Sequence, residues 1–312
     1  MTKIKKYIIL VVALSFVLQV QAQHKSEITI PLGAGIAPLK YQLNDGQSKF
    51  GFGEELGIAY SYYFSKMLGI SLGMEVALFG SSAKINNISY EQQIETPLGL
   101  SGQFFLQTEY EGLEEKQSAV FLQIPVLLQL QFPVSQSSFL FLGAGIKVGF
   151  PVSSKWTQNA TSLTTTGYSD YTDQYYTEIP KHGFSTRIDF YSSGKMELKS
   201  PVLFALEGGF KFAISKTTQL HTGIFLDYGL NNIHKASTNM PLMEYDNDSP
   251  TNYNYRSILT TNHYSASKGI KPFAVGIKIK MGMGFGGETA NKSEKPKKPT
   301  IPREQKTEPI GG

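Results

Sequence analysis

Eight segments of this chain repeat one two-residue alternation, which limits the possible folds more than any other feature of the sequence. Large apolar side chains take every second position, and glycine, alanine, glutamine or charged residues stand between them. Successive side chains of a strand point to opposite faces, so each segment predicts a strand with one large apolar face and one small or polar face. The segments are Glu27–Leu39, Phe52–Phe64, Leu68–Ser81, Ser118–Phe132, Phe139–Phe150, Val202–Ile214, Gln219–Asn231 and Ile270–Phe285.

The links between these segments alternate strictly in length. The short links are 65–67, 133–138 and 215–218, and the long ones are 40–51, 82–117, 151–201 and 232–269. Membrane β-barrels have short turns at one end and long loops at the other, and their large apolar side chains face lipid. A soluble β-sandwich would bury those side chains and expose its glycine-rich faces. We therefore predict an all-β fold, an eight-stranded antiparallel up-and-down transmembrane β-barrel with long extracellular loops.

The two ends of the chain differ from the middle. Residues 1–22 combine a basic head, an apolar stretch and a small residue at Ala22, which is typical of a secretory signal peptide. Residues 286–312 are rich in Pro, Lys and Glu and are too polar to form a core. The sequence predicts a signal peptide (1–22), an outer-membrane β-barrel (23–285) and a disordered tail (286–312), with both termini in the periplasm of a Gram-negative cell.

Charge and cysteine content exclude several classes of function. The chain has 29 Lys+Arg and 25 Asp+Glu, and three of the lysines lie in the first six residues. The predicted mature chain is therefore almost neutral, without the basic stripe that nucleic-acid binding requires. The absence of cysteine excludes disulfides, thiolate metal ligands and cysteine nucleophiles.

Three stretches carry a resemblance to known proteins. They are Val20-Gln21-Ala22-Gln23, AVFLQIPVLLQLQF at 119–132, and GIKIKMGMGF at 276–285. With this strand layout the chain resembles the small outer-membrane β-barrel families, OmpA-type and PorT-like. The resemblance implies outer-membrane lipid as the surroundings. It also implies that the barrel-assembly machinery acts on the closing strand, which ends in an aromatic residue, and it leaves other envelope proteins as candidate partners.

Charged side chains gather on the small faces of the strands, which a membrane barrel turns inward. An eight-stranded barrel has an interior that side chains can fill, and an unpaired charge inside it would be costly. We predict a salt-bridged plug, with a proton relay or narrow ion path as the alternative. The predicted luminal network comprises Glu55, Glu75, Lys147, Glu207, Lys211, His221, Asp227, Lys278 and Lys280.

The long links 151–201 and 232–269 are rich in tyrosine among small polar residues, a composition typical of recognition surfaces. The alternative is that these tyrosines extend the barrel hairpins, since tyrosine also suits strands. The candidate recognition residues are Tyr168, Tyr171, Tyr175, Tyr176, Tyr245, Tyr253 and Tyr255.

These features favour a non-enzymatic outer-membrane barrel with an envelope-structural role or an accessory role in an outer-membrane assembly, for instance a secretion apparatus. The first alternative is surface binding or adhesion through the tyrosine-rich loops. A second alternative, a lipid-modifying enzyme, needs a lipid-facing nucleophile beside a histidine, whereas His221 is predicted to face the lumen. No catalytic residue, cofactor or metal site is predicted.

Overall fold

Strands make up most of the computed structural model, which describes residues 25–95, 102–235, 239–246, 248–249 and 251–285. The predicted signal peptide (1–22) and tail (286–312) lie outside these residues, and so do residues 23 and 24. Eight strands form the barrel: β1 (Ser26–Ile36), β4 (Phe52–Tyr63), β5 (Leu68–Ile94), β6 (Phe104–Pro133), β7 (Ser138–Ser169), β10 (Val202–Ala213), β11 (Thr218–Gly229) and β14 (Lys271–Phe285). The remaining elements are β2 (Leu39–Lys40), β3 (Gln47–Phe50), β8 (Gln174–Tyr176), β9 (Ser185–Lys195), β12 (Met243–Glu244), β13 (Asn254–Tyr255), and the short 3-10 helices η1 (Pro180–His182) and η2 (Ile258–Thr260).

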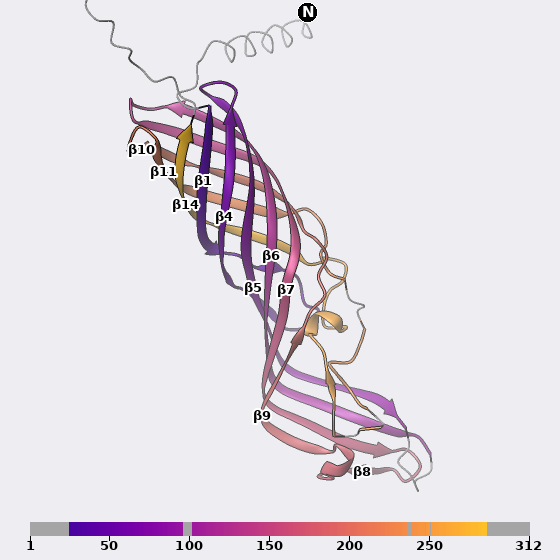
Figure 1. Cartoon of the computed structure of the whole chain (residues 1–312). Coiled ribbons are helices and arrows are strands. Elements are labelled where there is room, and N and C mark those ends of the chain that lie inside the picture. The colour runs from indigo at the N-terminus through magenta and orange to yellow at the C-terminus, as the bar shows by residue number, and fades with distance from the viewer. Residues whose placement is uncertain (1–24, 96–101, 236–238, 247, 250, 286–312) are drawn as a thin grey trace, which may run out of the picture.

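The eight long strands close into a ring. Each pairs antiparallel with its neighbour in the order β1-β4-β5-β6-β7-β10-β11-β14, and β14 pairs back onto β1. In the closing pair Ser26 lies opposite Phe285, so the described chain begins and ends beside the three short turns (Figure 1). We call this the turn end and the opposite end the head end. The predicted eight-stranded up-and-down barrel is confirmed.

The outer wall of the barrel is apolar. Alternate strand residues point outward and are exposed, for example Leu32 (55 %), Ile58 (55 %) and Ile277 (65 %). Exposing so continuous an apolar surface to water would be costly in free energy, whereas contact with lipid is favourable. We call these outward-facing apolar residues of the barrel strands the belt, and they cover the transmembrane part of the barrel. In the described part of the chain, no helix has the length and apolar character needed to cross a bilayer.

Three neighbouring strands continue far beyond the belt at the head end. β5, β6 and β7 have 27, 30 and 32 residues, whereas the other barrel strands have 11 to 15. Beyond Val148, β7 exchanges its partner β10 for β9. The segments 82–117 and 151–201, predicted as long loops, are therefore largely strands, and they form the part of the chain beyond the belt that we call the head (Figure 1).

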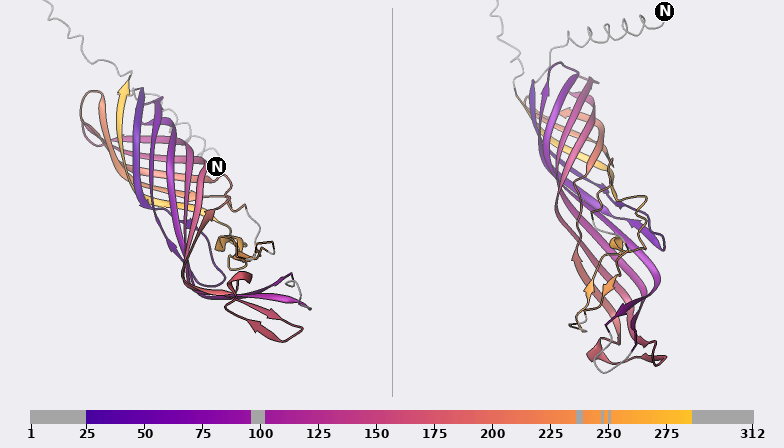
Figure 2. Two further views of the ribbon diagram at one scale, coloured as in Figure 1. Left: turned by 60° about the horizontal axis from the view of Figure 1, so that its bottom comes forward. Right: turned by 90° about the vertical axis from the view of Figure 1, so that its right-hand side faces the viewer.

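The head sheet bends along one line. In each of four adjacent strands two consecutive residues are turned away from the core, so the buried face passes from one set of alternate residues to the other. The pairing register is unchanged across the line, and Gly112 and Asp189 take positive φ angles of 65° and 53° there. Glycine kinks within strands introduce curvature without an inserted residue, and the left view of Figure 2 shows the strands turning. The residues on the line are Asn86–Asn87, Glu111–Gly112, Thr161–Ser162 and Ile188–Asp189.

The concave face of the head has its own apolar core. The segment that follows β11 folds over this face, and its Leu242, Met243 and Ile258 are almost fully buried. Gln92 donates a hydrogen bond to the Met243 carbonyl over 3.1 Å, which fixes the segment to β5. The head is thus a packed extension of the barrel rather than a set of separate loops.

Candidate functional site

The lumen of the barrel holds a buried ion network centred on Lys147. This lysine is 1 % exposed, and its Nζ lies 2.9 Å from Glu55, 2.8 Å from Glu75 and 2.8 Å from Asp227. These side chains come from β7, β4, β5 and β11, so one ammonium group ties four strands together across the interior. Three carboxylates share this one cation, and Glu55 and Glu75 gain a second cation in Lys278, which lies 2.5 Å and 3.9 Å from them.

A second cluster surrounds Glu207 on β10. Lys280 forms an ion pair with this carboxylate, Lys278 lies 3.6 Å from it, and Gln129 donates to it over 3.0 Å. Lys278 also lies 2.5 Å from Glu55 and so links the two clusters.

A third cluster lies near the turn end and is built around Glu27 of β1. Its carboxylate lies 2.6 Å from Lys211 and 2.7 Å from Nε2 of His221, and Lys211 also contacts Gln131 over 3.3 Å. All nine predicted luminal residues are therefore buried in the network. Glu27 was not among the predicted residues. It lies an even number of residues from the inward-facing Gly33 and Gly35, and so it shares their face of β1.

Among the described residues, the network joins five carboxylates to four ammonium groups and one imidazole. The carboxylates are Glu27, Glu55, Glu75, Glu207 and Asp227, and their partners are Lys147, Lys211, Lys278, Lys280 and His221. Aromatic rings pack against the ammonium groups, with Lys278 4.9 Å from the ring centre of Phe225 and Lys211 5.0 Å from that of Tyr63. Ion pairs, hydrogen bonds and aromatic packing thus fill the interior of the barrel.

A buried carboxylate closes the barrel at the head end. Glu115, on the part of β6 beyond the belt, is completely buried. It accepts hydrogen bonds from Ser257 Oγ (2.5 Å), Ile258 N (2.7 Å), Gln117 (2.8 Å) and Gln158 (2.8 Å). Burial raises the pKa of the Glu115 carboxyl, and these hydrogen bonds oppose the rise. One side chain thereby fixes the segment around η2 over the barrel mouth.

Sequence reasoning also missed Glu115, since it was predicted to lie in a loop. Strand parity would have found it, because Gln117, Ala119 and Phe121 occupy the same buried face at two-residue intervals.

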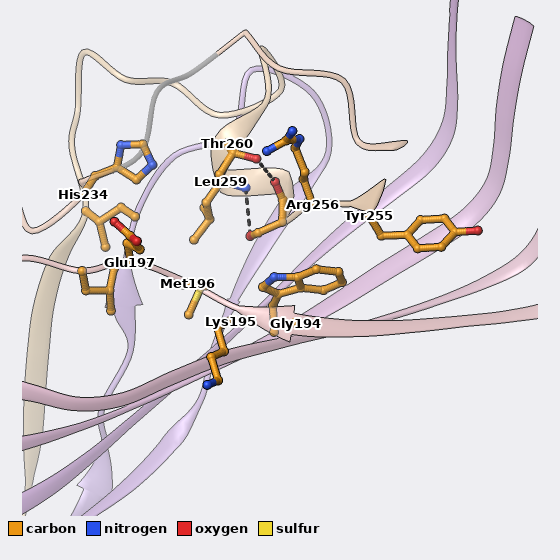
Figure 3. A pocket seen from close by; sticks show the side chains of 13 residues that line it. Gly194, Lys195, Met196, Glu197, His234, Tyr255, Arg256, Leu259 and Thr260 are labelled. Atoms are coloured by element: carbon orange, nitrogen blue, oxygen red, sulfur yellow. Dashed lines mark hydrogen bonds between the residues drawn. The ribbon is translucent and has the colours of Figure 1, made fainter. Parts of the chain in front are cut away.

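A small pocket lies beside this closure. It has a volume of about 220 Å³ between the end of β9 and the segment around η2 (Figure 3). Leu259 N and Thr260 Oγ1 both bond to Ser257, which holds that wall. Lys195, Glu197, His234 and Arg256 line it together with apolar groups. The lining combines acidic and basic side chains, so it favours neither an anionic nor a cationic ligand.

The predicted recognition tyrosines divide into two groups. Tyr253 is buried and bonds to the Gly183 carbonyl, Tyr245 donates to the His182 carbonyl over 3.2 Å, and Arg187 donates to the Tyr255 hydroxyl over 2.6 Å. These three tyrosines therefore pack inside the head.

The other four lie near the tip of the head. Tyr176 is half-buried against Phe104, whereas Tyr171 and Tyr175 are 72 % and 61 % exposed. Tyr168 donates to Asp173 over 3.0 Å, and its ring lies 4.8 Å from that of Tyr175. The tip thus presents aromatic surface to solvent.

No protein-family model matches the chain, and no curated protein matches it. Several solved structures are similar in outline. The Neisserial surface protein A is 10 % identical, with 82 % of this chain and 96 % of that chain covered and a TM-score of 0.31. The outer membrane protein OprG from Pseudomonas aeruginosa is 13 % identical, with 85 % of this chain and 98 % of that chain covered and a TM-score of 0.34. The attachment invasion locus protein Ail of Yersinia pestis is 11 % identical, with 83 % of this chain and 99 % of that chain covered and a TM-score of 0.27. At these TM-scores the likeness supports no inference, and the fold rests on the hydrogen-bonded ring itself.

Proposed function

We propose that this protein is a non-enzymatic integral outer-membrane protein that uses a closed barrel as an anchor and binds a partner through its extracellular head. The observation that carries the proposal is the unbroken passage of β5, β6 and β7 from the apolar belt into a head with its own core. A rigid connection of this kind holds a surface at a fixed position outside a membrane.

The apolar belt supports membrane insertion, and the unequal ends support an orientation. Short turns face the periplasm in outer-membrane barrels, and longer structures face outward. In that orientation the head is extracellular, and the chain ends beside Ser26 and Phe285 are periplasmic. Surrounding outer-membrane lipid and the barrel-assembly machinery are then the partners that insertion requires.

The luminal network supports an anchor rather than a conduit. Lys147, 1 % exposed, contacts three carboxylates from three other strands. An ion on its way through would have to break these contacts, and separating buried ion pairs is costly. His221 faces Glu27 inside the wall, which does not suit chemistry on lipid.

The head surface supports binding. Tyr171 and Tyr175 at the tip and Ile188 and Tyr191 on β9 are each more than 60 % exposed. Exposed tyrosines on a rigid support provide contact area at low cost in conformational entropy.

Photo-crosslinking on intact cells tests the proposal. A photoreactive amino acid at Tyr171 or Tyr191 should give a discrete adduct, whereas the same group at the lipid-facing Tyr62 should give none of that mass. If no head position gives an adduct, an envelope-structural role replaces binding. An adduct with another outer-membrane protein would instead assign the accessory role in an assembly.

A further inference from the structure

An open pocket of about 560 Å³ lies on the outside of the barrel, where the belt meets the head end. β14, β2 and β3 contribute to its walls, together with Tyr228 of β11 and the turn at Gly269. Three of its lining residues are lysines, Lys40, Lys268 and Lys271, and none is acidic.

The pocket contains two like charges placed side by side. Lys40 and Lys271 are register partners in the β2–β14 pair. Directly opposed side chains lie about 5 Å apart at their β-carbons, and equal charges at that spacing are destabilising. Within the described residues, no carboxylate lies within 4.0 Å of the ammonium groups of Lys40, Lys268 or Lys271, because all the ion pairs there are formed by other basic residues. An external anion would relieve the repulsion.

The pocket also lies at the level of a lipid headgroup. Phe273 is the next residue after Lys271 on the same face of β14, towards the turn end. Phe273 and its register partner Tyr228 are the aromatic residues of β14 and β11 that lie nearest the head end. Phe50, 68 % exposed, lines the same pocket. Aromatic rings mark the interface of a bilayer, and lysine side chains extend from it to the phosphates.

A second pair repeats this arrangement elsewhere on the rim. Lys155 of β7 and Lys195 of β9 are register partners just beyond Val152, which belongs to the belt. Lysine pairs thus occur directly above the belt at two places, but only the pair at Lys40 adjoins the larger, acid-free pocket.

We propose that this pocket binds the phosphate of an anionic lipid headgroup in the leaflet that surrounds the head end. The three lysines neutralise the phosphate, and the rings of Phe50, Tyr228 and Phe273 contact the first acyl carbons. This site rests on the proposed function insofar as the barrel must be inserted with the belt in lipid.

Native mass spectrometry of the full chain in detergent tests the site with three probes: short-chain phosphatidic acid, short-chain phosphatidylcholine and inorganic phosphate. The wild type should bind phosphatidic acid most tightly. Each lysine removed should weaken this binding about fivefold, because one lysine near a charged surface contributes about that factor. The variant K40A/K268A/K271A should therefore lose most of the binding, and K40R/K268R/K271R should keep it.

The matched control is K66A/K84A/K181A, which removes three exposed lysines at a turn and on the head. Equal binding of phosphatidic acid by the wild type and K40A/K268A/K271A overturns the site. Equal affinity for inorganic phosphate and phosphatidic acid would overturn the lipid as the source. Flotation with phosphatidylethanolamine–phosphatidylglycerol vesicles separates the two proposals: a chain that does not float contradicts membrane insertion, whereas a chain that floats without selective binding contradicts only the headgroup site.

Discussion

Gly143 and Glu207 are register partners on β7 and β10, and a β-carbon on Gly143 would lie 2.7 Å from Cγ of Glu207. Two further luminal glutamates have the same relationship to a glycine, Glu55 to Gly33 and Glu75 to Gly57. The inward glycines therefore provide the space in which carboxylates fold across the wall to reach their lysines.

Replacing Gly143 with alanine should destabilise the barrel by about 1–3 kcal/mol, because the added methyl group overpacks a buried site. The displaced Glu207 would also lose contact with Gln129 or Lys280. The urea midpoint of unfolding of the detergent-solubilised protein measures the effect. G80A is the control, since its new β-carbon would meet no atom closer than 3.4 Å. A midpoint for G143A equal to that of G80A would show that the glycine is not needed for space.

Replacing Lys147 with methionine should destabilise the barrel by about 3–5 kcal/mol, because carboxylates that share one cation would be left buried without it. K84M removes an exposed lysine of the head and should change the unfolding free energy little. The double variant K147M/D227N should recover part of the loss, since one of the uncompensated charges is removed as well. If K147M unfolds at the wild-type midpoint, Lys147 does not hold the network together.

The fold and the luminal network could be predicted from the sequence because both depend on a two-residue period that holds throughout the belt. Glu55, Lys147 and Glu207 share their strand faces with glycines, which identified the inner face. Beyond the belt this argument no longer applies. The head strands are polar on their outer face, as at Lys84 and Glu114, so they lack the apolar contrast of lipid-facing strands.

The alternation also changes phase at the bend. A residue such as Tyr110 therefore lies on the buried face although its position relative to Leu113 suggests the opposite one. Composition alone could not separate the buried Tyr253 from the exposed Tyr171, because their burial depends on contacts between distant segments. The two tyrosine-rich links pack against each other through long-range contacts, such as that of Tyr253 with the Gly183 carbonyl, which no local pattern records.

The closure held by Glu115 should weaken as the pH rises. The pKa of this carboxyl is raised in the closed state above its ordinary value of 4.5, so the closed state prefers the protonated form. Closure is then strongest at or below that ordinary value and is lost progressively as the pH rises through the raised pKa. Hydrogen exchange at the Ile258 amide, corrected for intrinsic rates, should show more frequent opening at pH 8 than at pH 5.

The variant E115Q is the control for this pH dependence, because it has no titrating group and should open equally at both pH values. A wild-type protein that opens equally at both pH values, or one that opens more at pH 5, would contradict the role of Glu115.

The bend of the head depends on Gly112, whose φ of 65° lies in the left-handed region. A β-carbon there would also lie 2.7 Å from Oγ1 of Thr161 on the next strand. Valine is β-branched and avoids this backbone conformation, whereas asparagine adopts it more readily. G112V should therefore cost the head at least about 1 kcal/mol, and G112N should cost less. Because the bend is separate from the belt, both variants should retain the heat-modifiable migration of a folded barrel in gels. Limited proteolysis should cut the head of G112V faster than that of G112N or the wild type, and equal cleavage of all three would show that the bend does not require this glycine.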